Sequence, residues 1–477
     1  MVERITSIFK SYFNGGSSAI KNKFYYLFIT LFFKTVINFF LLFYIAKVVN
    51  VAEFGSFTLS FVAMTLGILL IDYGYNLHSL VLNFADKFEL SNSISAAISG
   101  KIFISLALIF LAIPILYHIT LDEITKKVLL VLVISAIPSS FGNYYFSLFK
   151  AKNNYYVETI GFFLQGILLI TLLSINHFYG NINIIALAII VFLTKTIYFI
   201  YAFFKFKNEF KFKFKLSFKK ALQSYVSSYS YGIHLVFGTL ILYVETLFLS
   251  YFSDLETVGY YQSALRLIMA ASLFGAIITD GYVPEISKNK DRKKFITEKM
   301  LNLFAFLTVF YFLLLLTLGF YFETIINILF SSKFELVENY AAYILLIILF
   351  RAIGIVPGVI LTSLGLQKKR AKAVLYSCLL SIILNITLIP FYGLEGAFIS
   401  FLFTNVFLNI IYFFHAFKEI NFIKIRLYYV MYLLLIYSIV QLFFAKDNAF
   451  CLSISILCNL GILLFTQIKI KKKNAIN

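Results

Sequence analysis

Apolar stretches long enough to cross a lipid bilayer follow one another along nearly the whole chain, separated by short polar segments. A helix needs about 20 mainly apolar residues to span the hydrocarbon core, because each residue advances it by about 1.5 Å. We therefore predict an all-α, polytopic membrane protein of fourteen transmembrane helices. The predicted spans are residues 24–49, 55–80, 94–117, 128–149, 155–176, 182–204, 223–251, 257–283, 300–322, 338–364, 373–391, 394–417, 428–445 and 449–468.

Two segments of the chain resemble each other and indicate an internal duplication. In residues 51–76 and 255–287, an acidic residue and a glycine before an aromatic residue open an apolar span that ends with Asp and Gly, at Asp72 and Gly74 and at Asp280 and Gly281. The copies are six spans apart, an even number, so they have the same orientation in the membrane. We expect two six-helix bundles around a central cleft, plus two C-terminal helices.

This organisation divides the chain into five expected parts. They are an interfacial N-terminal segment (1–23), an N-terminal six-helix bundle (24–204), a basic cytoplasmic linker (205–222), a C-terminal six-helix bundle (223–417), and two extra helices with a basic cytoplasmic tail (418–477).

Composition excludes a soluble fold and argues against an enzyme. Hydrophobic residues make up 61% of the chain and charged residues 13%. The short connections leave no room for a separate catalytic domain, and no acidic pair or His cluster suggests catalytic residues. The three cysteines, Cys378, Cys451 and Cys458, lie in apolar runs without the spacing of metal ligands, so we expect no metal site.

The basic residues predict the orientation of the chain. Of 41 lysines and arginines, 31 lie in the termini and loops of one face if the N-terminus is inside, and five lie in the loops of the other face. Positive charge accumulates on the cytoplasmic side of membrane proteins, so both termini are expected in the cytoplasm. The net charge of +19 therefore reflects topology rather than nucleic-acid binding. The Lys205–Lys220 loop can also hold anionic lipid head groups.

Four basic residues lie deep in predicted spans and are the candidate substrate-binding residues, together with Asn38, one turn from Lys34. These basic residues are Lys34, Lys195, Arg266 and Arg351. An ionisable group near mid-bilayer costs about 2.5–3.5 kcal/mol, so several of them imply partners or a wet cavity. Polar or small residues share a helix face with each arginine: Gln262, Ser263 and Ala270 beside Arg266, and Gly354, Gly358 and Thr362 beside Arg351. Each such stripe suits a cavity wall.

Structural alternatives exist for the same residues. Lys34 and Lys195 can snorkel toward the inner interface along their apolar stems. Arg266 and Arg351 can pair with Glu245 or with a backbone carbonyl. Lys101, nearer the end of its span, is expected to snorkel.

Candidate coupling or gate residues are Asp72, His234, Glu245 and Asp280. Span seven carries a predicted polar face of Ser227, Ser230, His234, Gly238 and Glu245. His234 is either a proton relay or a satisfied hydrogen-bond former. Glu245 is a ligand for a coupling ion, an arginine partner or a solvated group. Asp72 shares a face with Asn76 and Ser79 and forms either a cytoplasmic gate contact or a solvated span end. We expect no cofactor, although Na⁺ or H⁺ coupling is compatible with these residues.

Several motifs resemble those of Wzx-type flippases for lipid-linked oligosaccharides, including O-antigen flippases, in the multidrug/oligosaccharidyl-lipid/polysaccharide transporter superfamily. The similar segments are EFGSFTLSF, DYGYN, VGYYQSALRLIMAAS, YVPEIS and ITLIPFYGLEGAFISFLFTN, the last with Pro390, Gly393 and Gly396 in place. The resemblance covers essentially the whole chain and rests on glycines, a proline and the number of spans.

The resemblance implies a multi-pass flippase of the bacterial cytoplasmic membrane. It would move a polyprenyl-diphosphate-linked oligosaccharide from the cytoplasmic to the outer leaflet by alternating access, in surface polysaccharide biosynthesis. Its partners would be this glycan, membrane lipids and polysaccharide assembly proteins, with no nucleic acid. The alternatives are a lipid II flippase or a multidrug cation antiporter of the same superfamily, or a membrane polysaccharide polymerase.

Overall fold

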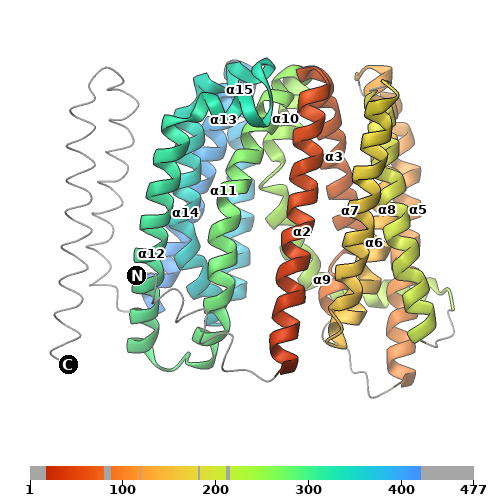
Figure 1. The fold of residues 1–477 in the computed structure, drawn as a ribbon. Helices are drawn as coiled ribbons and strands as arrows, with labels where there is room; N and C mark the ends of the chain where they lie inside the picture. The colour runs from red at the N-terminus through yellow and green to blue at the C-terminus, as the bar shows by residue number, and fades with distance from the viewer. Residues whose placement is uncertain (1–17, 80–86, 119, 181–182, 211–214, 420–477) are drawn as a thin grey trace. The chain divides into compact units, whose positions relative to one another are not determined.

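The computed structural model describes residues 18–79, 87–118, 120–180, 183–210 and 215–419. These residues form helices and connecting turns, with no strand among them (Figure 1). Hydrocarbon offers no hydrogen-bond partners, so a spanning segment must pair its backbone groups internally, as an α-helix does. The predicted all-α fold is therefore confirmed for the described residues. The predicted spans 428–445 and 449–468 and most of the expected interfacial segment lie outside them.

Contacts between Cα atoms divide the chain into two compact units, unit 1 (Met1–Tyr243) and unit 2 (Val244–Asn477). The helices of unit 1 are α2 (Ser18–Val48), α3 (Val51–Asp72), α4 (Tyr75–Ser79), α5 (Lys87–His118), α6 (Glu123–Ala151), α7 (Tyr156–Phe178), α8 (Ile184–Glu209) and α9 (Phe218–Leu240). Those of unit 2 are α10 (Val244–Phe252), α11 (Leu255–Lys288), α12 (Lys293–Phe320), α13 (Phe322–Leu329), the 3₁₀ helix η1 (Ser332–Tyr340), α14 (Ala341–Ser363) and α15 (Gln367–Glu419).

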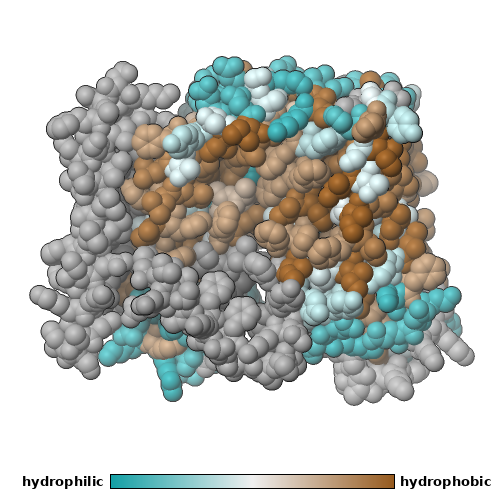
Figure 2. Space-filling view, in the orientation of Figure 1, coloured by the Kyte–Doolittle hydropathy of each residue, from teal (hydrophilic) through white to brown (hydrophobic). Residues whose placement is uncertain are grey.

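Within the described residues, nine helical segments are long and apolar enough to cross a membrane. One of them, Gln367–Ala416, contains two of the predicted spans. Two further predicted spans within the described residues are also helical, 223–251 as α9 with α10 and 257–283 as α11. In the view of Figure 2, hydrophobic residues cover the middle of the helices and hydrophilic residues gather at their ends. This is the pattern expected of a multi-pass membrane protein.

Several helices begin where a short polar side chain bonds a free backbone N–H group of the first turn. Asn50 and Glu53 form a reciprocal capping box at the start of α3. Asp122, Asn183 and Asp254 cap α6, α8 and α11 through side-chain oxygens that each accept a hydrogen bond from a backbone N–H. These caps fix where the apolar spans begin.

The same helix packings occur in both units. In unit 1, α3 packs on α6, α6 packs on α8, and α2 packs on α7. In unit 2, α11 packs on α14, and α14 and α10 each pack on α15. Numbered by predicted span, the pairs of unit 1 are spans 2 and 4, 4 and 6, and 1 and 5. The pairs of unit 2 are spans 8 and 10, 10 and 12, and 7 and 11, each six spans later than its counterpart. The two units thus share the packing that an internal duplication would produce, whereas the central cleft stays a prediction.

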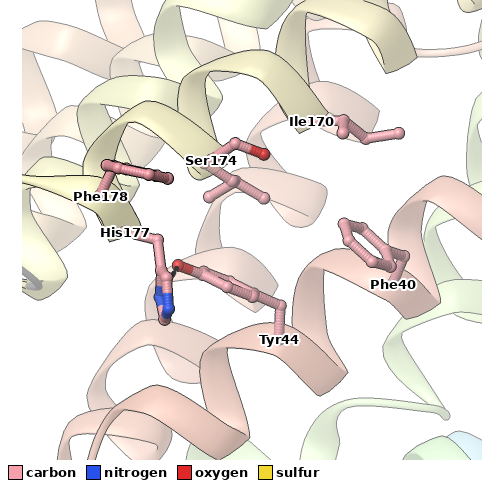
Figure 3. A pocket seen from close by; sticks show the side chains of 7 residues that line it. Phe40, Tyr44, Ile170, Ser174, His177 and Phe178 are labelled. Carbon is pink, nitrogen blue, oxygen red and sulfur yellow. Dashed lines mark hydrogen bonds between the residues drawn. The ribbon is translucent and has the colours of Figure 1, made fainter.

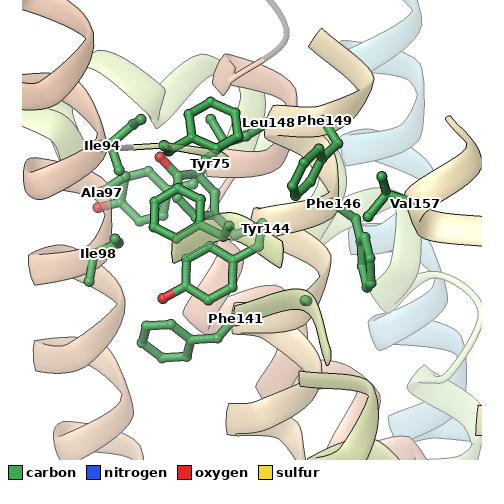
Figure 4. Close-up of a cluster of buried hydrophobic side chains, with 14 of the residues drawn as sticks. Tyr75, Ile94, Ala97, Ile98, Phe141, Tyr144, Phe146, Leu148, Phe149 and Val157 are labelled. Carbon is green, nitrogen blue, oxygen red and sulfur yellow. The ribbon is translucent and has the colours of Figure 1, made fainter. Parts of the chain in front are cut away.

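Aromatic side chains form a buried cluster in unit 1 (Figure 4). Its rings come mainly from α6 and α8, and Tyr75 of α4 joins them. Tyr145 stacks on Phe206 with ring centroids 4.5 Å apart, and Phe146 lies 4.8 Å from Tyr198. Such contacts between large rings fix the neighbouring helices firmly.

Helix α15 is a hairpin of two antiparallel arms. A continuous helix of its 53 residues would be about 80 Å long. Instead, Lys369 at its start forms an ion pair with Glu419 at its end, with 3.0 Å between Nζ and Oε1. The chain reverses at Gly393, whose φ of 51° and ψ of −123° are open to glycine and strained for other residues. The two predicted spans 373–391 and 394–417 are therefore the two arms.

We predict that Gly396→Ala destabilises this hairpin. A Cβ at Gly396 would lie 2.6 Å from the carbonyl oxygen of Leu388, a backbone atom that cannot move aside freely. Overpacking of this kind costs about 1–3 kcal/mol. Thermal unfolding of the purified protein in detergent measures the loss. The matched control is Gly238→Ala, where an added Cβ meets no atom within 4 Å. Equal melting temperatures for both variants would contradict the prediction.

Candidate functional site

Lys34 lies on α2 against α7, with its Nζ 5.7 Å from the centre of the Phe162 ring. It is exposed in the chain taken alone and forms no ion pair within 4.0 Å among the described residues. Its charge interacts with the carboxylate of Glu158 and with Lys195 of α8. Lys34 and Lys195, two of the predicted basic residues, thus lie close enough for their charges to interact. Asn38, one turn further along α2, is half-buried.

Lys101 is completely buried, so the prediction that it snorkels is wrong. Its Nζ lies 3.1 Å from Oδ1 of Asp72, in an ion pair between α5 and the end of α3. The same ammonium donates to Oγ of Ser140 at 2.8 Å and to its carbonyl oxygen at 3.2 Å. The rings of Tyr75 and Tyr144 lie 5.8 Å and 5.4 Å from it. Because the carboxylate of Asp72 balances its charge, the Lys101 ammonium can stay buried without contact with water.

Asp72 is correspondingly not a solvated span end, because it is 4% exposed. Helix α3 ends at Asp72, and Tyr73 and Gly74 follow with φ of 38° and 87°. The expected common face with Asn76 and Ser79 is therefore interrupted, since both belong to the separate helix α4. Asp72 connects the two helices instead, because its Oδ1 accepts a hydrogen bond from the backbone N–H of Asn76.

Arg266 is buried in unit 2 and is held by neutral groups. Its Nη2 donates to Oε1 of Gln262 at 2.8 Å, one turn earlier on α11. Gln262 in turn donates to Oγ1 of Thr246 on α10 at 2.6 Å. In the part of the chain that the structure describes, no carboxylate lies within 4.0 Å of this guanidinium, and its Nε has no hydrogen-bond partner.

Arg351 of α14 is likewise held without a carboxylate among the described residues. Its Nε donates to Oγ of Ser272 at 2.9 Å, and its guanidinium lies 6.0 Å from the Phe401 ring. Neither arginine therefore forms the alternative ion pair with Glu245 in this structure. Both guanidiniums keep an uncompensated positive charge.

The stripe that follows Arg351 does not form the expected cavity wall. A Cβ at Gly354 would clash with the side-chain oxygen of Asn409, and one at Gly358 would contact Tyr412. These glycines thus let the second arm of α15 approach α14 closely. Thr362 accepts a hydrogen bond from Nη1 of Arg370 at 2.7 Å. The small residues in this stripe serve helix packing, which sequence spacing alone does not distinguish from a cavity wall.

Glu245 is fully buried, so it is not a solvated group. Its Oε1 accepts hydrogen bonds from Oγ of Ser381 at 3.0 Å and from Nδ2 of Asn385 at 3.5 Å, both on α15. The Tyr261 hydroxyl lies near the same carboxylate without hydrogen-bond geometry, and Oε2 of Glu245 has no partner. The side-chain oxygens of Asn385 and Ser377 also lack partners. Several buried oxygens with free lone pairs thus lie on neighbouring helices.

The predicted polar face of span seven is interrupted. Residues 241–243 form a turn between α9 and α10, so Gly238 and Glu245 do not lie on one continuous helix. The side chains of His234 on α9 and Asp280 on α11, like those of Ser227 and Ser230, lie outside the described part. Their proposed roles stay predictions.

A hollow of about 340 Å³ lies between the C-terminal ends of α2 and α7 (Figure 3). Its lining is mostly apolar, and Tyr44 and His177 point toward one another at its edge, with 3.3 Å between the hydroxyl and Nδ1. It contains none of the predicted site residues. An apolar hollow without cations does not suit a diphosphate.

These features define an all-helical, multi-pass membrane protein with basic groups deep in its spans. Its fold is that of the MOP superfamily of transporters. A structure described as lipid II flippase MurJ in an inward closed conformation matches with a TM-score of 0.68 and 18% identity, covering 94% of this chain and 99% of that chain. An inward-facing multidrug resistance MATE transporter matches with a TM-score of 0.63 and 13% identity, covering 82% and 95%.

A MOP superfamily transporter from Pyrococcus furiosus also matches, with a TM-score of 0.53, 14% identity and coverage of 85% and 96%. Residues 20–290, more than half of the chain, match the family of polysaccharide biosynthesis proteins. The chain therefore belongs to this family. No curated protein matches the sequence.

We predict that Lys101→Met strongly destabilises unit 1, because it leaves the Asp72 carboxylate buried and unpaired. Breaking a buried ion pair costs about 3–5 kcal/mol, whereas replacing both partners by neutral groups is often harmless. The double variant Asp72→Asn/Lys101→Met should therefore recover most of the loss, measured by thermal unfolding in detergent. Lys126→Met, which breaks an exposed pair with Glu123, is the control and should cost less than about 1 kcal/mol. A double variant as unstable as the single one would contradict the prediction.

Proposed function

We propose that the chain moves a polyprenyl-diphosphate-linked oligosaccharide from the cytoplasmic to the outer leaflet of a bacterial cytoplasmic membrane by alternating access. The glycan's diphosphate would bind the basic groups, and its lipid tail would stay in the bilayer. Membership of the polysaccharide biosynthesis family supports this proposal. So does the likeness to a structure described as a lipid II flippase.

The observation that carries the proposal is that, among the described residues, Arg266 and Arg351 have no carboxylate to balance their charge. Each guanidinium is held by neutral side chains and, among the described residues, lacks a carboxylate. An uncompensated charge inside a membrane is costly and is a functional candidate by default. Guanidinium groups bind phosphate through paired, charge-assisted hydrogen bonds. An anionic head group would supply the missing negative charge.

The membrane potential can assist this transport. The diphosphate linkage carries two negative charges at neutral pH, and the potential of the cytoplasm is negative. Moving two such charges outward across 100 mV is favoured by about 4.6 kcal/mol.

A multidrug cation antiporter is a rival within the same fold. A cationic cargo needs buried carboxylates that are free of basic partners. In the described residues, Asp72 is paired with Lys101 and Glu158 with Lys150, which leaves Glu245 alone among the buried carboxylates. The basic groups therefore favour an anionic cargo. A lipid II cargo has the same diphosphate chemistry and is distinguished by the sugar that supports transport.

A membrane polysaccharide polymerase is the rival from another class. The three solved structures named above are described as two transporters and a flippase. Glycosyl transfer would need a placed acid and base, whereas the buried carboxylates Asp72 and Glu158 are paired with lysines.

We further propose that Glu245 binds the coupling cation, Na⁺ or H⁺. Na⁺ prefers oxygen ligands, and the free oxygens of Glu245, Asn385 and Ser377 are buried on neighbouring helices. A proton on the carboxylate would satisfy the same site by removing its charge. His234, Asp72 and Asp280 stay candidates for the gate.

We predict that Arg351→Gln slows transport while leaving the fold intact, because glutamine can still bond Ser272 but carries no charge. Hydrogen bonds to charged groups contribute about 1.5–3 kcal/mol, which corresponds to a loss of roughly 10- to 100-fold. The measurement is transfer of a polyprenyl-diphosphate oligosaccharide across liposomes that contain the purified chain. Lys126→Gln serves as the control for a lost surface charge. An unchanged rate for Arg351→Gln would remove Arg351 from the site.

We predict that Glu245→Gln abolishes the dependence of transport on a cation gradient. The amide can neither be protonated near neutral pH nor balance the charge of Na⁺. Transport into liposomes is compared with and without a Na⁺ or proton gradient. Glu323→Gln, at an exposed position of α13, is the control. A wild-type chain that responds to neither gradient would exclude coupling, and a variant that still responds would place the cation elsewhere.

A further inference from the structure

Glu158 lies near the start of α7, beside a lysine of α6 and within electrostatic range of a lysine of α2. It is 8% exposed, and its Oε1 lies 2.8 Å from Nζ of Lys150 at the end of α6. Lys34 of α2 also interacts electrostatically with Glu158, and Lys195 of α8 interacts with Lys34. In this group, three lysines (Lys34, Lys150 and Lys195) therefore accompany one carboxylate, that of Glu158.

The packing of α2 on α7 directs Lys34 toward Glu158. The hydroxyls of Thr30 and Thr159 are 2.8 Å apart, and Lys34 covers the ring of Phe162, so the two helices run in parallel. Side chains on a helix lean toward its N-terminus. The ammonium of Lys34 thus leans toward the level of Glu158, one turn before Phe162. The two groups attract each other without a contact shorter than 4.0 Å.

Lys195 lies near Lys34. The rings of Phe162 and Tyr198 are 5.0 Å apart, which fixes α8 beside α7 at this level. Lys195 precedes Tyr198 by one turn, and its charge is close enough to that of Lys34 for mutual repulsion. The group has a formal excess of two positive charges, equal to the charge of a diphosphate diester.

We propose that Glu158 is a positioning residue, an internal carboxylate that attracts Lys34 when no cargo is bound and yields Lys34 to the diphosphate when cargo arrives. This inference rests on the proposed function. It assigns Glu158 the role of a competitor: the anion must overcome an attraction that already exists in the empty protein. The consequence is weaker binding and faster release than three free lysines would give.

The experiment measures binding of inorganic pyrophosphate to the purified full chain in detergent by calorimetry. Glu158→Gln removes the competing charge and should tighten binding about two- to fivefold, the range of a partly exposed ion pair. Lys34→Gln should weaken binding. In the double variant Lys34→Gln/Glu158→Gln, loss of the carboxylate should give a smaller gain than in the single variant, because Lys34 is gone and only Lys150 is released.

Control variants separate this role from a structural one. Glu158→Asp keeps the charge and should bind pyrophosphate nearly as the wild type does. Glu209→Gln breaks the partly exposed pair with Lys152 at the ends of α8 and α6 and should leave binding unchanged. Thermal unfolding of each variant reports the stability that Glu158 contributes through Lys150. Unchanged or weaker binding by a folded Glu158→Gln variant would overturn the proposal.

The outcomes also distinguish this inference from the proposed function. If pyrophosphate binding depends on Lys34 and Arg351 but not on Glu158, the inference alone fails. If the wild-type chain does not bind pyrophosphate, or binds it independently of both basic residues, the proposed function fails with it. Glu158→Gln could also tighten pyrophosphate binding equally in the wild-type chain and in the Lys34→Gln variant. That result would show a general charge effect and would also overturn the inference.

Discussion

The structure depends on one constraint: inside hydrocarbon, each polar or charged group must find its partner within the protein. The constraint makes every span helical, because a helix pairs its own backbone. It also decides where the side chains of the spans can point. Lys101 illustrates the strength of the requirement, since its ammonium is enclosed by Asp72, Ser140 and two tyrosine rings. A lysine without that carboxylate would have to extend toward water.

The two units satisfy this constraint in different ways. Unit 1 pairs its buried carboxylates with lysines, as Asp72 with Lys101 and Glu158 with Lys150. Unit 2 surrounds its arginines with amides, hydroxyls and aromatic rings instead. Neutral partners fix the position of a guanidinium without cancelling its charge. Ion pairs thus balance the buried carboxylates Asp72 and Glu158 of unit 1, whereas Arg266 and Arg351 of unit 2 keep their positive charge.

Sequence predicted the helical class and most spans, because apolar length is a local property that a bilayer converts directly into structure. It failed where partners come from distant segments. Nothing near Lys101 in the sequence identifies Asp72, 29 residues earlier, as its partner. The glycines after Arg351 have the spacing of a cavity wall, yet the second arm of α15 fills that face. Glu158 was missed because it lies at a helix end, where an acidic residue is ordinary.

Uncompensated arginines also bear on how the proposed transport would be controlled. When a transporter switches between inward-open and outward-open conformations, the surroundings of its buried charges change. Each uncompensated charge raises the free-energy cost of that conformational change. A bound diphosphate would neutralise the basic groups and lower this cost. The loaded protein would then change conformation more readily than the empty one. Cargo binding and the conformational change would be coupled through charge, without a further switch.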